Sequence, residues 1–145
     1  MVLISVEKIM TRLTTLILLF CCLVFSIQAQ DKKMIRSIYF GGGSYYIDNR
    51  QEEELINFLD SIPNMNEYHI TIHSHTDNIG GAAFNKRLSE MRSWSAKQIL
   101  IPNYAEEAAV EIQDFGQFNP LYDNSTSLGR MKNRRVDIIF WPVSI

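Results

Sequence analysis

The chain has 145 residues, of which 14 are Lys or Arg, 16 are Asp or Glu, and 46% are hydrophobic. This length predicts a single domain, and the composition excludes an intrinsically disordered chain. The slightly acidic balance also argues against a general binder of polyanions such as nucleic acids.

The first segment has the features of an export signal. Lys8 and Arg12 precede an apolar run over 13–24, which the small residues of "SIQA" close. A basic start, a short apolar core and a small residue at the cut are typical of a secretory signal. We therefore predict a cleaved signal peptide over 1–29, with Met10 as an alternative start. An uncleaved membrane anchor is the other interpretation, although the run is short against the roughly 20 residues of a spanning helix.

Both cysteines, Cys21 and Cys22, lie within this predicted signal. Bulky Phe20 precedes them, which argues against attachment of a lipid at either one. The mature chain over 30–145 is then expected to form one domain without a disulfide. Its length is sufficient for two packed layers of secondary structure.

The mature chain predicts alternating strands and helices. β-Branched and aromatic runs indicate strands, and apolar residues three or four positions apart indicate helices. In chain order, the expected elements are a strand over 34–40, a helix over 48–62, a strand over 67–75, a helix over 83–100, a strand over 109–115 and a strand over 134–141. A short helix after Ser125 is a further option within the last long loop.

Local patterns assign faces to these elements. Asp48 can cap the first helix. Ile70 and Ile72 alternate with polar residues, so their strand should have one dry face. Its other face, expected to be wet, would carry His69, Thr71, His73 and His75. The core stripe of the second helix is expected to comprise Phe84, Leu88, Met91 and Ile99. These elements predict an α+β fold, a two-layer sandwich in which helices cover one face of a small mixed β-sheet, in the order β-α-β-α-β-(α)-β.

Polar residues gather around the start of the second helix. Asn85, Ser89 and Arg92 share one stripe, because they are four and then three residues apart. Asp77 lies 15 residues before Arg92, and a Gly-Gly turn over 80–81 separates them. An ordinary helix boundary and a structural salt bridge are the simpler interpretations. The functional interpretation is a site for a zwitterion, a ligand with an ammonium and a carboxylate close together.

Two long motifs resemble a known family. The segment TDNIGGAAFNKRLSEMRSWS, from Thr76, resembles the T-D-x-x-G-x-x-x-x-N-x-x-L-S-x-x-R signature of the OmpA-like C-terminal domain. The tail NPLYDNSTSLGRMKNRRVDI, from Asn119, is similar to that family's closing P-x-x-x-N-x-T-x-x-G-R-x-x-N-R-R-V-E-I, with Asp137 where Glu is commoner. The resemblance covers about residues 38–140.

This resemblance implies non-covalent binding of peptidoglycan, centred on the diaminopimelate of its stem peptide. By resemblance, Asp77 would bind the ammonium group of the ligand, and Arg92 would bind its carboxylate as a bidentate fork. Asn85 would position the ligand or its loop, Thr76 would orient the strand end, and Arg134 would provide a second cation. The family implies neither catalytic activity nor a cofactor.

The first loop departs from the family pattern. Many relatives carry Asp or Asn near the ligand where this chain has Gly41, Gly42 and Gly43. Backbone N–H groups, with that of Gly43 among the expected ligand contacts, could replace the missing side chains because glycine permits close approach. Affinity and ligand choice stay open at this point.

Other functions are alternatives to peptidoglycan binding. His69, His73 and His75 share one strand face, and a His-x-His pair can hold a metal ion, although a polar outer face is the simpler interpretation. A domain that has lost its ligand could act as an interaction subunit of the envelope. The basic segment over 129–135 is short and lacks aromatic residues, so no nucleic-acid partner is expected. The signal and the resemblance predict a periplasmic or outer-membrane-associated protein whose partners are peptidoglycan and other envelope proteins.

Overall fold

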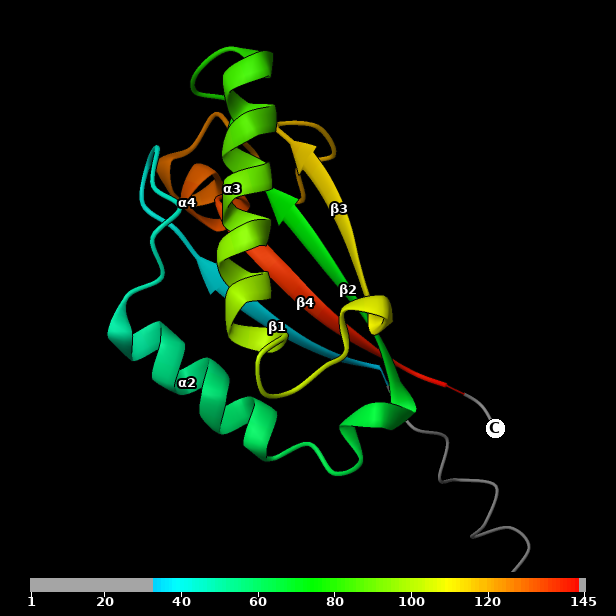
Figure 1. Cartoon of the computed structure of the whole chain (residues 1–145). Coiled ribbons are helices and arrows are strands. Elements are labelled where there is room, and N and C mark those ends of the chain that lie inside the picture. The colour runs from blue at the N-terminus through cyan, green and yellow to red at the C-terminus, as the bar shows by residue number, and fades with distance from the viewer. Residues whose placement is uncertain (1–32, 144–145) are drawn as a thin grey trace, which may run out of the picture. The chain divides into compact units, whose positions relative to one another are not determined.

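The computed structural model describes residues 33–143, and Figure 1 shows how their helices and strands are arranged. In chain order these are β1 (Met34–Tyr39), α2 (Asn49–Asp60), β2 (Tyr68–His75), α3 (Ala82–Leu100), β3 (Val110–Gly116), α4 (Ser127–Asn133) and β4 (Arg135–Pro142). Single 3-10 turns, η1 (Met65–Glu67) and η2 (Glu107–Ala109), precede β2 and β3. The predicted signal over 1–29 lies outside the described residues. Within the described range, no helix is long and apolar enough to cross a membrane.

The four strands form one mixed sheet in the order β1-β4-β2-β3. β4 runs antiparallel to both β1 and β2, whereas β2 and β3 are parallel. A parallel pair needs a long crossover connection, and α3 supplies it. This topology places β2 and β4 at the centre of the sheet, where they carry most of its core residues.

The hydrophobic core lies between the helices and one face of the sheet. Alternation along β2 and β4 turns every second side chain toward the helices. The fully buried members of the core come from both strands and both long helices: Ile70, Ile72, Val136, Ile138, Phe140, Leu55, Ala96 and Leu100. Since α2 and α3 contribute to one cluster, they cover the same sheet face (Figure 1). The predicted α+β two-layer sandwich is confirmed.

The other face of β2 is drier than its alternation predicts. Thr71 and His75 are only 6% and 7% exposed. The indole N–H of Trp141 donates to Oγ1 of Thr71 at 2.9 Å, and the ring of Phe115 stacks on that of His75 with 4.9 Å between centroids. The expectation of a wet face was therefore wrong at these two positions, because aromatic side chains of the neighbouring strands cover them.

The buried side of α3 also differs from the predicted stripe. Phe84 is 55% exposed and Met91 is only half-buried, whereas the polar residues Asn85, Ser89 and Arg92 are at most 1% exposed. The first turns of α3 extend past the end of β2 (Figure 1), so they pack on loops and not on the apolar sheet face. Loop backbone presents N–H and carbonyl groups that need partners, which polar side chains supply.

Candidate functional site

A pocket of about 270 Å³ opens where β2 leads into α3. All six residues proposed from the sequence line it: Gly43, Thr76, Asp77, Asn85, Arg92 and Arg134. The β1–α2 loop contributes the glycine, the β2–α3 connection and α3 contribute the next four, and the end of α4 contributes Arg134. The fold therefore brings together residues that the sequence places in three separate segments.

Asp77 is 6% exposed and is held from two sides. Its Oδ1 accepts the N–H of Ile79 at 3.2 Å, and its Oδ2 accepts Nη1 of Arg134 at 2.9 Å. Arg134 follows α4 directly, and its Nε donates to the carbonyl of Phe40 at 3.0 Å. The ion-pair partner of Asp77 is thus Arg134, and Arg92 makes no direct contact with this carboxylate within ion-pair distance among residues 33–143.

Arg92 lies on α3 with 0% of its surface exposed. Its Nε, Nη1 and Nη2 donate to the carbonyls of Ser44, His75 and Gly41 at 2.8, 2.9 and 3.1 Å. The guanidinium also lies 4.8 Å over the ring of Phe40. Burial, partly offset by the charge of Asp77, lowers the pKa of Arg92 to about 10, so this side chain is charged at neutral pH.

These contacts differ from the expectation that the guanidinium of Arg92 is free to bind a ligand carboxylate through two hydrogen bonds. An arginine has five N–H donors, and three of those of Arg92 are bound to backbone carbonyls. The residue therefore ties the first loop to the end of β2, and its two remaining donors are what a ligand could use. Arg134 has two of its donors bound, and its side chain is 19% exposed, which makes it the more accessible cation.

Asn85 and Thr76 fix the pocket wall. Nδ2 of Asn85 donates to the carbonyl of Ile79 at 3.2 Å and to Oε1 of Gln117 at 2.8 Å. Oδ1 of Asn85 is buried and has no hydrogen-bond partner within the described part of the chain. Thr76 donates its hydroxyl to the carbonyl of Asp77 at 2.9 Å and its N–H to Gly116 at 2.7 Å. Asn85 thus has an unpaired acceptor buried in the pocket wall, whereas the backbone N–H of Thr76 is occupied.

Space around the first loop does not explain why glycine occupies positions 42 and 43. A Cβ at Gly42 or Gly43 would meet no atom within 4 Å. Gly43 adopts a φ of 68°, which is the left-handed region that favours glycine. The loop position depends instead on the two carbonyls, of Gly41 and Ser44, that Arg92 binds.

In the described part of the chain, the histidines of β2 are not grouped as ligands for a metal ion. Within residues 33–143, no three His, Cys, Asp or Glu side chains are placed to share a metal ion. Burial, reinforced by the charge of Arg135, lowers the pKa of His75 to about 4. His69 lies 3.6 Å from a carboxylate oxygen of Glu111. The geometry gives no support to the metal-binding alternative.

Several contributors to the pocket were missed at the sequence level. Gln117 anchors Asn85 from the loop after β3, a segment that departs from the family pattern and carried no signal. Phe84 and Ile79 line the pocket and are 55% and 63% exposed, although the predicted core stripe of α3 includes Phe84. The backbone carbonyls that hold Arg92 have no side-chain signature at all, so no sequence pattern could have identified them.

Comparison with known proteins relates this chain to a protein family. The OmpA family model matches residues 39–134. Outer membrane protein Omp38 of Acinetobacter baumannii is 31% identical over 108 residues, which are 74% of this chain and 30% of that protein. Outer membrane porin F of Pseudomonas aeruginosa is 34% identical over 86 residues, or 59% of this chain and 24% of that protein. The chain thus spans about a quarter of the length of the porin F relatives it matches.

Solved structures share the fold at lower identity. The peptidoglycan-associated lipoprotein from Burkholderia pseudomallei has a TM-score of 0.67 at 24% identity, over 73% of this chain and 90% of that one. The cell wall anchor of the type VI secretion system (T6SS) from Pseudomonas aeruginosa has a TM-score of 0.65 at 19% identity, over 76% of this chain and 82% of that one. These relatives and neighbours are structural and binding proteins, which supports the prediction that this chain is not an enzyme. From the match to its family model, the chain belongs to the OmpA family.

Proposed function

We propose that this domain binds peptidoglycan non-covalently, through the diaminopimelate of the stem peptide. The observation that carries the proposal is one pocket that holds Asp77, Arg92 and Arg134. A carboxylate and two guanidinium groups match a ligand end that bears both an ammonium and a carboxylate. Family membership supports the proposal, since two of the similar structures are named for peptidoglycan or the cell wall.

The ammonium group would bind to the acceptors of the pocket. Each carboxylate oxygen of Asp77 accepts one hydrogen bond in the present structure and has capacity for another. The buried Oδ1 of Asn85 has no partner among the described residues, and an unpaired buried acceptor costs about 1–3 kcal/mol. A ligand ammonium would share the charge of Asp77, and it would satisfy this oxygen when the side chain of Asn85 turned it toward the pocket.

The carboxylate group would bind between the two arginines. Arg134 has unused N–H donors beside its contact with Asp77, and Arg92 has two donors that no backbone carbonyl occupies. Two guanidinium groups against one carboxylate leave the pocket with a net positive charge, which favours an added anion. A plain lysine end would bring only the ammonium and would leave these donors unpaired, so it should bind less well.

The site implies a location in the cell. Peptidoglycan is reached only after export, so we propose that the protein acts in the periplasm or in association with the outer membrane. Outer-membrane or periplasmic proteins are further candidate partners. The predicted signal over 1–29 would direct this export.

Co-sedimentation with purified peptidoglycan sacculi tests the proposal. In protein produced from the full chain, Asp77→Asn keeps the shape of the side chain and its acceptor for the Ile79 N–H, but it removes the charge. Binding should fall at least about tenfold, the value of one charge-assisted hydrogen bond. Glu53→Gln, on the exposed side of α2, removes the same charge outside the pocket and should bind like wild type.

Competition separates the ligand classes. Free diaminopimelate should displace the protein from sacculi. Nα-acetyl-lysine amide, whose only charged group is the side-chain ammonium, should not displace it at the same concentration. If Asp77→Asn bound sacculi as well as wild type, the proposed site would be wrong. If folded wild type failed to sediment at all, the interaction-subunit alternative would be the better account.

A further inference from the structure

We propose that a second groove, on the outer side of α3, binds the glycan strand of the same polymer. This inference rests on the proposed function and extends it from the stem peptide to the sugars that carry the peptide. The groove has a volume of about 500 Å³ and is lined by Tyr45, Arg87, Glu90, Met91 and Trp94. It does not include the residues assigned to the peptide pocket.

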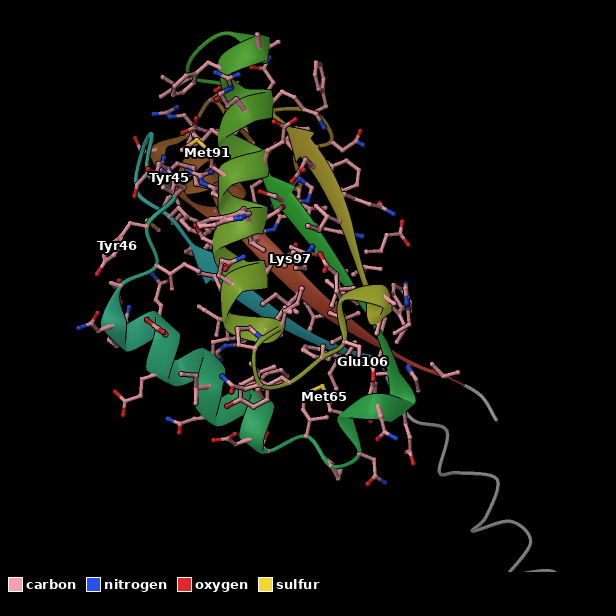
Figure 2. The ribbon with its side chains drawn as sticks, viewed as in Figure 1. Tyr45, Tyr46, Met65, Met91, Lys97 and Glu106 are labelled. Carbon is pink, nitrogen blue, oxygen red and sulfur yellow. The ribbon has the colours of Figure 1, made fainter. Side chains whose placement is uncertain are left out.

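The groove is built by one side of a helix and one loop. Arg87, Glu90, Met91 and Trp94 are three, four and seven residues apart, so they share a side of α3. Trp94 is 60% exposed, and Tyr45 of the β1–α2 loop is 44% exposed. Figure 2 shows Tyr45 and Met91 on the same side of α3, whereas Tyr46 points away from the helix. Exposed aromatic side chains gathered in one hollow mark a binding surface.

The chemistry of the lining fits a neutral amino-sugar chain. Pyranose rings present flat C–H faces that stack on aromatic rings, and their hydroxyl and acetamide groups bond to planar polar side chains. Within residues 33–143, no hydrogen bond or ion pair holds the side chain of Arg87 or Glu90, so the donors of one and the acceptors of the other stay available. Their charges cancel, which suits an uncharged ligand better than a polyanion.

The groove adjoins the peptide pocket through a shared loop. Gly42 and Gly43 line the pocket, and Tyr45 lines the groove two residues later. Arg92 holds the carbonyl of Ser44 at 2.8 Å, and the hydroxyl of Ser95 holds the carbonyl of Tyr45 at 2.9 Å. One side of the loop therefore faces the peptide pocket and the other faces the groove, and both sides are fastened to α3.

The distances suit a ligand that fills both sites. The pocket is lined by α3 residues between Phe84 and Arg92 and the groove by α3 residues between Arg87 and Trp94, so the two hollows lie next to each other along the helix. Leu88 of the pocket and Met91 of the groove are three residues apart, which is about 4.5 Å of helix rise. A stem peptide of three residues spans at most about 10 Å, so a sugar attached to its first residue can reach the groove while its diaminopimelate occupies the pocket.

Calorimetry with matched ligands tests this inference on protein produced from the full chain. The ligands are a disaccharide carrying a diaminopimelate-containing stem peptide, and the same peptide without sugar and with its N-terminus acetylated. In wild type the sugar should strengthen binding. Trp94→Ala and Tyr45→Ala should each weaken binding of the sugar-bearing ligand by about threefold to tenfold, as expected for one stacked ring, without changing the affinity of the free peptide. Tyr46→Ala, a neighbouring exposed tyrosine outside the groove, should leave both affinities unchanged.

The outcomes distinguish this inference from the proposed function. Affinity for the free peptide reports on the pocket alone, and the increment from the sugar reports on the groove alone. If the peptide failed to bind, chitin oligosaccharides would still have to quench the emission of Trp94, read in a Trp141→Phe background. No sugar increment in wild type, or equal losses for both ligands in Trp94→Ala, would overturn the inference. Self-association that Trp94→Ala abolishes would assign the groove to a second copy of the chain.

Discussion

Replacement of Arg92 by lysine tests whether this residue holds the first loop in place. The guanidinium reaches three carbonyls on two segments, those of Gly41, Ser44 and His75. A single lysine ammonium cannot reproduce this spread of donors, so at least two bonds should be lost. Hydrogen bonds to a charged group contribute about 1.5–3 kcal/mol each, which gives a loss of about 3 kcal/mol or more.

This loss is large enough to measure without ambiguity. Since 1 kcal/mol shifts the midpoint of a domain of this size by about 4–8 °C, the melting temperature of Arg92→Lys should fall by at least about 10 °C. Urea unfolding should show a lower midpoint with an unchanged slope. Amide exchange of residues 41–46 should accelerate, because their carbonyl anchors are gone.

Arg50→Lys is the matched control for this substitution. Arg50 lies on α2 with its side chain 73% exposed, and it pairs with Glu54 on the same helix at 2.7 Å. An exposed pair of this kind contributes little, so the control should melt like wild type. If Arg92→Lys also melted like wild type, its carbonyl contacts would not stabilise the fold, and the structural role assigned here to Arg92 would be wrong.

Two further predictions concern the sheet and α4. Burial, reinforced by Arg135 and opposed by Asp137, lowers the pKa of folded His75 to about 4 from 6.5, so stability should be full above pH 6.5 and should fall by up to about 3 kcal/mol as the pH drops toward 4. The free energy of unfolding, measured with urea between pH 4 and 7, should change less with pH in His75→Gln than in wild type. The same pH dependence in both proteins would contradict the assignment. A Cβ at Gly129 would overlap the carbonyl oxygen of Asp123, so Gly129→Ala should cost at least about 2 kcal/mol. Gly42→Ala, with no atom within 4 Å, is its control in thermal unfolding, and equal melting of the two variants would refute the steric argument.

Most of the fold could be predicted from local sequence signals. Asp48 caps α2 as expected, since its Oδ1 accepts the N–H of Gln51 at 2.9 Å. The alternation of Ile70 and Ile72 located the core face of β2 correctly. The errors lie where tertiary packing overrides periodicity: Phe84 is on a turn of α3 that extends past the sheet, and His75 is covered by Phe115 from the neighbouring strand.

The residues of the candidate site could be predicted from the sequence, but their hydrogen bonds and ion pairs could not. Spacing and the family motifs selected the residues that line the pocket. They could not show that Asp77 pairs with Arg134, because 57 residues separate the two and their contact depends on the pairing of β4, which follows Arg134, with β2. The anchoring of Arg92 was equally invisible, because its acceptors are backbone carbonyls that every residue type possesses.

In the proposed binding mode, the glycine loop changes which groups of the pocket would recognise the ligand. Because Arg92 binds loop carbonyls, the loop can keep its position without the Asp or Asn side chains that the family pattern places there. An Asp in this loop would offset the charge of the two arginines, so the pocket of this chain is more cationic than that of a relative with Asp. Its acceptors for an ammonium reduce to Asp77 and the unpaired Oδ1 of Asn85. Ligand choice should therefore depend more strongly on the carboxylate end than on the ammonium end. Gly42→Asp, which the open space at this position accommodates, should move that balance back toward the ammonium.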